Sequence, residues 1–84
     1  MKLWLLRARD DLDPELSPWN SPYNKNFGFV IRAFTEEDAR AIANGNAYDE
    51  NANGQPWLDA DYSTCDELLA DGLAGAVISD FYHA

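Results

Sequence analysis

The stretch "FGFVIRAFTEEDARAIANG", residues 27–45, decides the fold, because a strand pattern is followed at once by a helix pattern. Residues 27–34 are rich in aromatic and β-branched side chains, which favour a strand. Thr35 can cap the following helix, and Asp38 stands at the third helical position of a capping-box pattern. The apolar stripe of this helix consists of Ala39, Ile42 and Ala43. Gly45 can end the helix, so we predict a strand joined directly to a helix.

A second strand is predicted over residues 2–9, "KLWLLRAR". Its two faces carry Leu3, Leu5 and Arg7 on one side and Trp4, Leu6 and Ala8 on the other. Because both faces are apolar, we expect an interior strand or one at a contact between copies of the chain. Residues 10–26 contain three of the four prolines and are predicted to form a long loop, of a length that is usually functional or mobile. Residues 46–56, with the turn pair Asn53-Gly54, are also predicted as loop.

The third part of the chain predicts a short helix and a last strand. In "STCDE", residues 63–67, a hydroxyl residue is followed three positions later by an acid, which is typical of a capping box. We therefore expect a short helix over about residues 65–70 that stops at Gly72. The segment "AGAVISDFYHA", residues 74–84, then predicts the third strand.

These elements predict a single α+β domain over residues 1–84 with the order ββααβ. We expect a small, mostly antiparallel three-stranded sheet, with the main helix packed on one face and one short helix elsewhere. A chain of 84 residues can bury roughly 60% of its unfolded surface, which is enough for one core. Apolar residues make up 46% and aromatic residues 13%, which argues against disorder despite the high charge.

Negative charge is concentrated in the second half of the chain. The net charge is −9, and residues 42–84 contain eight acids and neither Lys nor Arg. Such a segment cannot neutralise itself by local ion pairs, so pairing must come from the first half or from another molecule. DNA or an anionic membrane would be repelled, whereas a basic protein surface would be attracted. The alternative is that the acids only keep a small protein soluble.

Cys65 is the only cysteine, which excludes an intrachain disulfide and favours a reducing compartment. The N-terminal apolar run has four residues, too few for a signal peptide or a membrane span. We therefore expect a cytoplasmic protein. Cys65 and His83 could in principle act as nucleophile and base, but the cysteine should be buried as a small hydrophobe, so we expect no enzyme.

Two acidic stretches, "DDLDPE" at residues 10–15 and "DADYST" at 59–64, place carboxylates two positions apart as calcium loops do. Neither has glycine at the sixth loop position or an acid at the twelfth, so solvated acidic loops are expected instead. The sequence also has no zinc-ligand set, phosphate loop or dinucleotide fingerprint. We expect no metal and no cofactor.

Four aromatic side chains fall in predicted loops. They are Trp19, Tyr23, Trp57 and Tyr62. One interpretation is that they fold back to complete a small core, and the other is that one or two anchor a protein interface, where Trp and Tyr are favoured.

Three segments, "MKLWLLR", "FGFVIRAFTEEDARAIA" and "WLDADYSTC", resemble those of short acidic proteins of bacteria and their phages. That type of protein is similar to the anti-CRISPR inhibitors of type I systems. The resemblance implies a protein that binds a surveillance complex, with the large subunit as the candidate partner, and blocks the entry of target DNA. It implies no catalytic residues and does not locate the contacts.

The leading hypothesis is a non-enzymatic inhibitor that places a carboxylate-rich face on a basic, DNA-binding surface and excludes DNA by acidic mimicry. The residues expected at this face are Asp49, Glu50, Asp59, Asp61, Asp66, Glu67 and Asp71, with Trp57 and Tyr62 as anchors. The other hypothesis is a small cellular interaction module of unrelated role that works as a homo-oligomer, such as a homodimer, through its two-sided strand.

Overall fold

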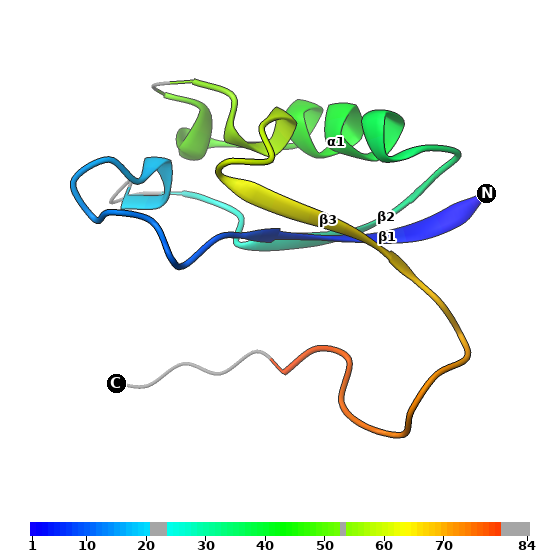
Figure 1. Ribbon diagram of the computed structural model, residues 1–84. Coiled ribbons are helices and arrows are strands. Elements are labelled where there is room, and N and C mark those ends of the chain that lie inside the picture. The colour runs from blue at the N-terminus through cyan, green and yellow to red at the C-terminus, as the bar shows by residue number, and fades with distance from the viewer. Residues whose placement is uncertain (21–23, 53, 80–84) are drawn as a thin grey trace.

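The computed structural model describes residues 1–20, 24–52 and 54–79, and it contains three strands and one α-helix (Figure 1). The strands are β1 (Lys2–Ala8), β2 (Gly28–Ala33) and β3 (Ser63–Leu68), and the helix is α1 (Glu36–Gly45). Three short 3-10 helices occupy Pro18–Asn20, Asp49–Asn51 and Pro56–Leu58. The predicted α+β class with a three-stranded antiparallel sheet is therefore confirmed.

The strand β1 lies in the middle of the sheet, in the order β2-β1-β3, and pairs antiparallel with both neighbours. Leu6 stands opposite Phe29 on β2 and Cys65 on β3. Leu5, which points to the other side of the sheet, stands opposite Val30 and Asp66. The prediction of an interior strand is confirmed, because a central strand can bring apolar side chains to both faces.

The predicted strand-to-helix unit is also confirmed. The Thr35 hydroxyl accepts a hydrogen bond from the backbone N–H of Asp38 at 3.1 Å, which caps the N-terminus of α1. Acidic side chains fill the first helical turn, where the helix dipole favours negative charge. The helix ends at Gly45, as the sequence predicted.

The short helix predicted over about residues 65–70 was wrong, because residues 63–68 form the strand β3. A local capping box is worth only about 1 kcal/mol, whereas pairing with the free edge of β1 provides a ladder along six residues. The Ser63 hydroxyl is used in the interior instead, where it donates to the Pro56 carbonyl oxygen at 2.9 Å. The order ββααβ is accordingly replaced by ββαβ with short 3-10 turns.

The segment predicted as the last strand lies only partly within the described residues. Residues 74–79 form no strand, and residues 80–84 lie outside the described part. Of the predicted turn pair, Asn53 also lies outside it, and Gly54 has a φ of 151°, a conformation that favours glycine.

The core lies between α1 and one side of the sheet, which we call the helix face. Its buried apolar residues are Leu6, Trp19, Ile31, Ala33, Ala39, Ala43 and Trp57. Ring contacts join Trp57 to Trp19 at 4.8 Å and to Phe29 at 4.9 Å between centroids. The Trp19 indole also donates to the Tyr62 carbonyl oxygen at 3.0 Å, which ties the first long loop to the start of β3.

The other side of the sheet has no helix on it, and we call it the open face. By strand alternation and register it carries Leu3, Leu5, Arg7, Val30, Arg32, Thr64, Asp66 and Leu68. The chain beyond β3 passes below this face, whereas α1 and the 3-10 helices Asp49–Asn51 and Pro56–Leu58 lie above the sheet (Figure 1). The sheet thus separates a covered side from a side that exposes apolar and charged groups together.

Candidate functional surface

The structure distributes the predicted site residues over several regions. Those with exposed side chains are Asp59, Asp61, Asp66, Glu67 and Asp71. Asp49 and Tyr62 are half-buried, and Glu50 and Trp57 are buried. Asp66 and Glu67 are consecutive residues of β3 and therefore point to opposite sides of the sheet. The nine residues do not form one continuous face.

Trp57 is 0% exposed and cannot serve as an interface anchor. It is the largest fully buried side chain, and the other buried apolar residues of the core are Trp19, Leu6, Ile31 and three alanines. Of the two interpretations of the loop aromatics, folding back onto the core is therefore correct for Trp57 and for Trp19, which is 6% exposed. Tyr23 lies outside the described residues.

Glu50 is 1% exposed and is a structural carboxylate rather than part of an acidic surface. It accepts hydrogen bonds from the Trp57 indole at 2.9 Å, from the backbone N–H of Tyr48 at 3.0 Å and from that of Asn26 at 3.1 Å. Burial, the largest single influence, acts to raise the pKa of Glu50, but these donors together hold it below its ordinary value. The ionised carboxylate thus ties three segments of chain together.

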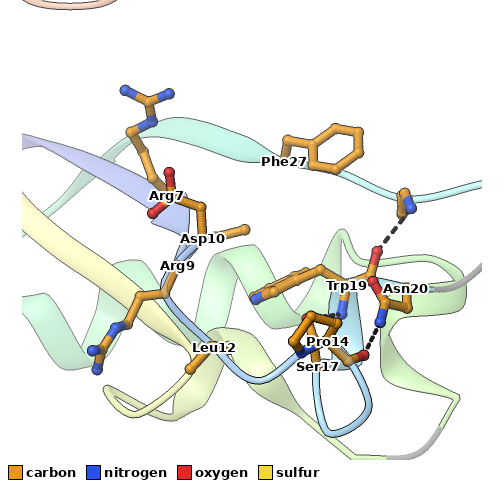
Figure 2. A pocket seen from close by; sticks show the side chains of 11 residues that line it. Arg7, Arg9, Asp10, Leu12, Pro14, Ser17, Trp19, Asn20 and Phe27 are labelled. Atoms are coloured by element: carbon orange, nitrogen blue, oxygen red, sulfur yellow. Dashed lines mark hydrogen bonds between the residues drawn. The ribbon is translucent and has the colours of Figure 1, made fainter.

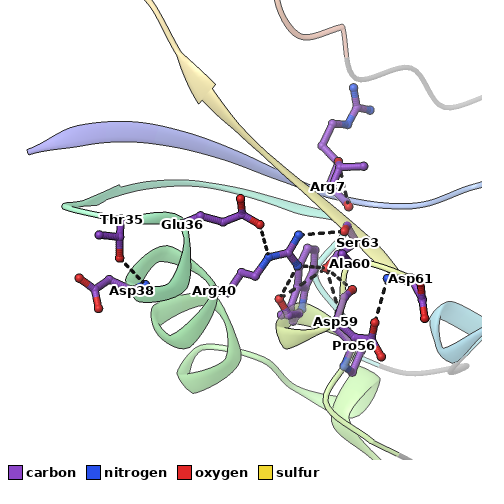
Figure 3. A network of polar contacts seen from close by, with 12 residues as sticks. Arg7, Thr35, Glu36, Asp38, Arg40, Pro56, Asp59, Ala60, Asp61 and Ser63 are labelled. Carbon is purple, nitrogen blue, oxygen red and sulfur yellow. Dashed lines mark hydrogen bonds and ion pairs between the residues drawn. The ribbon is translucent and has the colours of Figure 1, made fainter.

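Arg40 is a second buried charged side chain, and its hydrogen bonds join α1 to the loop before β3 (Figure 3). The guanidinium is 2.9 Å from the Glu36 carboxylate, 3.0 Å from the Trp57 carbonyl oxygen and 2.8 Å from the Ser63 hydroxyl. It also donates to the Ser63 carbonyl oxygen at 3.1 Å. With its donors engaged and 8% exposure, Arg40 fixes the loop before β3 against α1.

This fixed arrangement creates what we call the acidic groove, a hollow of about 570 Å³ between the start of α1 and the loop before β3. It is lined by Glu36, Glu37, Arg40, Leu58 and Ala60. Leu58 is 43% exposed and provides an apolar patch.

Two of the predicted acids extend the loop side of the groove. Asp59 lies between two lining residues in the chain, and its carboxylate accepts the backbone N–H of Asp61 at 2.8 Å. Figure 3 shows the side chains of Asp59 and Asp61 on one side of Arg40 and that of Glu36 on the other. Glu36 and Glu37 thus line the groove from α1, and Asp59 and Asp61 lie beside lining residues of the loop, at its rim.

The sequence did not indicate that Glu36 and Glu37 belong with Asp59 and Asp61. In the sequence the two glutamates indicate only the first turn of a helix, where the helix dipole favours acids, and more than 20 residues separate them from the second pair. Arg40 joins the two segments, because it binds the Glu36 carboxylate and the backbone carbonyl oxygens of Trp57 and Ser63, and its position one turn after Glu36 was the only signal in the sequence.

The remaining acids have other surroundings. Glu67 pairs with Lys2 at 3.5 Å, Asp66 lies on the open face, and Asp71 follows the sheet in the exposed C-terminal segment. Asp49 accepts the backbone N–H of Asn24 at 3.0 Å and supports the same loop as Glu50. None of these four residues lines the acidic groove, although the sequence placed them on the same face as Asp59 and Asp61.

The titratable groups considered for catalysis do not come together within the described residues. Burial is the largest influence that raises the pKa of the Cys65 thiol, and nearby Glu36 acts in the same direction, which favours the less nucleophilic protonated form. His83 lies outside the described residues. Over the described ranges, no group of three or more His, Cys, Asp or Glu side chains could hold a metal ion.

No helix in the described part of the chain has the length and apolar character needed to cross a membrane. Comparison with protein-family models found no match, and neither curated proteins nor solved structures gave one.

Proposed function

We propose that this protein is a non-catalytic inhibitor that binds a basic, DNA-binding surface of another protein through the acidic groove and its rim. The resemblance to anti-CRISPR proteins makes the large subunit of a type I surveillance complex the first partner to test. In this proposal the carboxylates take the place of DNA phosphates and the protein blocks target DNA. Glu50 and Trp57 support the surface from the interior and are not contacts.

The observation that carries the proposal is the excess of exposed carboxylates beside an apolar patch. Within the described residues, three ion pairs involve Lys2, Arg9 and Arg40, so each of these bases is already matched to an acid. Glu37, Asp59 and Asp61 are exposed and make no such pair there. Carboxylates of this kind accelerate and orient association with a basic surface.

The groove also offers a defined geometry. Arg40 holds the loop 57–63 against α1, so the acids of the two segments are presented from rigid elements. Leu58 supplies an exposed apolar group among them, which a basic partner with a small apolar pocket can cover. Acids that only keep a protein soluble would instead be scattered over the surface, with no residue such as Arg40 to hold their segments together.

The first experiment is a pull-down of type I surveillance complexes with the protein, followed by a target-DNA binding assay at two salt concentrations. We expect binding that weakens as salt rises and that prevents DNA binding, because exposed charge pairs are screened. Absence of binding, or binding that leaves DNA loading intact, would refute the proposal.

A second candidate function is a homo-oligomeric interaction module, and the open face favours it. Leu3 is 37% exposed and Val30 52% exposed, on a sheet side that carries no helix. A second copy that packs on this face would remove both from water. The molar mass in solution, measured by light scattering over a range of concentrations, distinguishes a dimer from the monomer expected of the simple inhibitor.

A further inference from the structure

The strand β2 forms one edge of the three-stranded sheet, and within the described residues no other strand pairs with its outer side. At the start of its ladder with β1, the backbone N–H of Ala8 donates to the Phe27 carbonyl oxygen at 3.0 Å, so these two residues are a hydrogen-bonded pair. Hydrogen-bonded pairs alternate with non-bonded pairs in an antiparallel ladder. The residues of β2 that bond to β1 are therefore Phe29, Ile31 and Ala33.

The backbone groups of β2 that are left over point away from the sheet. By the same alternation they are the N–H and C=O groups of Gly28, Val30 and Arg32. All three residues are exposed. Such a row of unpaired donors and acceptors is a template for another strand. The outer edge of β2 is thus open to pairing.

The ladder on the other side of β1 identifies the outward groups of β3 in the same way. The backbone N–H of Arg9 donates to the Tyr62 carbonyl oxygen at 3.0 Å, which makes these residues a hydrogen-bonded pair. By alternation along the register, the residues of β3 whose backbone groups face outward are Ser63, Cys65 and Glu67.

This second edge is protected against pairing, whereas the edge of β2 is not. Arg40 donates to the outward carbonyl oxygen of Ser63 at 3.1 Å. Asp66 and Glu67 carry negative charge along the rest of β3, and charged side chains of this kind keep edge strands apart. The strand β2 contains no acid, and its only charged residue is Arg32. Of the two edges, β2 is the one at which another strand can pair.

Large apolar side chains are exposed along the same segment of chain. Phe27 is 63% exposed, Val30 52% and Phe34 66%. Figure 2 shows the Phe27 ring pointing away from Trp19 and the core, beside a hollow of about 600 Å³. Exposed apolar groups next to unpaired backbone groups mark a site of protein association.

We propose that β2 pairs antiparallel with β2 of a second copy of the chain, which joins the two sheets into one continuous sheet. Two copies with a net charge of −9 repel each other, so they associate most readily where acids are absent, and β2 is such a place. The contact is the same on both copies, so the assembly closes at two. This contact, which rests on the second candidate function of a homo-oligomer, lies at the strand edge rather than on the open face.

Val30 gives the pairing a defined register. It is the middle one of the three outward residues, so a two-fold axis there pairs Val30 with Val30 of the second copy and Arg32 with Gly28 of the second copy. The two arginines then do not face each other, whereas like charges directly opposite would be destabilising. The Val30 side chains meet on the open face, where each is 52% exposed in the single chain.

The direct test is amide hydrogen exchange of the full chain, followed by NMR at low and high protein concentration, with the molar mass of the same samples measured by light scattering. We expect the Val30 and Arg32 amides to exchange at least about tenfold more slowly in the dimer than in the monomer, because their N–H groups then donate across the contact. Cys65 and Glu67, the outward residues of the other edge, are the control and should exchange equally at both concentrations.

The outcomes separate the edge contact from the homo-oligomer itself. A dimer in which the Val30 and Arg32 amides still exchange rapidly would overturn the edge contact and leave a homo-oligomer that packs elsewhere. A monomer at every concentration would overturn both the edge contact and the second candidate function. Slow exchange of the same amides in a monomer would show that the chain covers its own edge, which would also overturn the proposal.

Matched substitutions test the same contact through the dissociation constant of the dimer. Val30→Lys places like charges opposite each other at the two-fold axis and should raise this constant at least about tenfold. Thr64→Lys adds the same charge at an exposed position of β3 on the same face and should leave the constant unchanged. Equal constants for the two variants would contradict pairing through β2. Circular dichroism establishes that each variant is folded, and the exchange experiment decides the question if Val30→Lys is not.

Discussion

The two faces of the central strand β1 show how neighbouring residues in one strand can have opposite roles. On the helix face, Leu6 is 0% exposed and packs with the aromatic core, and on the open face Leu3 is 37% exposed. Charged groups differ in the same way. Arg40, which lies above the helix face, donates hydrogen bonds to Glu36, Trp57 and Ser63. The side chains of Arg7 and Arg32 on the open face make no ion pair within the described residues.

The difference indicates that the fold is maintained from one side only. Aromatic packing lies between the sheet and α1, and two buried charged groups, Glu50 and Arg40, fix the loops on that side. The open face contributes little burial within the described residues. We therefore expect substitutions on the helix face to change stability more than substitutions on the open face.

The largest effect is expected from Leu6→Ala. The removal of a fully buried side chain should lower the free energy of unfolding by about 2–5 kcal/mol, a large share of the stability of a small domain. Leu3→Ala, three positions earlier on the open face, should cost less than about 1 kcal/mol because the side chain is partly exposed. Urea denaturation measures both, and equal losses would contradict the one-sided account.

Removal of Arg40 should have the next largest effect. Arg40→Met keeps an apolar stem but leaves the buried carbonyl oxygens of Trp57 and Ser63 without their donor, at a cost of about 1–3 kcal/mol for each unsatisfied group. Arg32→Met on the open face should change stability by no more than about 0.5 kcal/mol. The same denaturation measurement applies, and a stable Arg40→Met variant would show that packing alone holds the loop.

Glu50 predicts a specific dependence of stability on pH. Its folded pKa lies below the ordinary value of 4.5, so the stabilisation exists above about pH 4.5 and is lost as pH falls through the folded pKa. Glu50→Gln should therefore cost about 1–3 kcal/mol at neutral pH, and its difference from the wild type should shrink in acid. Unfolding curves at several pH values test this, and a difference that is constant with pH would refute the ionic role.

The sequence predicted the first half of the fold because its signals are local. The run of β-branched and aromatic residues before Thr35, and the cap at Thr35 itself, act between close neighbours and do not depend on the rest of the chain. The strand β3 could not be predicted in this way, since Ser63 and its neighbours form a helix-cap pattern that is overridden by the free edge of β1. The outcome was decided by a partner that lies more than 50 residues away.

The candidate surface was predicted only in part. The acidic excess and the positions of Asp59 and Asp61 were visible in the sequence, and both side chains are exposed. Glu50 could not be told apart from them, because its burial depends on donors from Tyr48, Asn26 and Trp57 that meet only in the folded chain. Spacing along the chain does not reveal which acid is inside.

The smallest effect is expected for the reactivity of Cys65, which lies on the helix face. Because burial raises its pKa, its alkylation by iodoacetamide near neutral pH should be severalfold slower than in the unfolded protein. A cysteine introduced on the open face by Thr64→Cys, in a Cys65→Ser background, should react faster because that position is exposed. Equal rates for the two thiols would show that the faces do not differ in access.

We propose that the position of the exposed carboxylates, rather than the total charge of the protein, determines binding to a basic DNA-binding surface. The most direct test is a competition assay for target DNA on a type I surveillance complex with two triple variants that change the net charge equally. Glu37→Gln/Asp59→Asn/Asp61→Asn removes acids at the groove, and Asp10→Asn/Glu15→Gln/Asp71→Asn removes exposed acids elsewhere. We predict that only the groove variant loses inhibition, and equal inhibition by both variants would contradict the account.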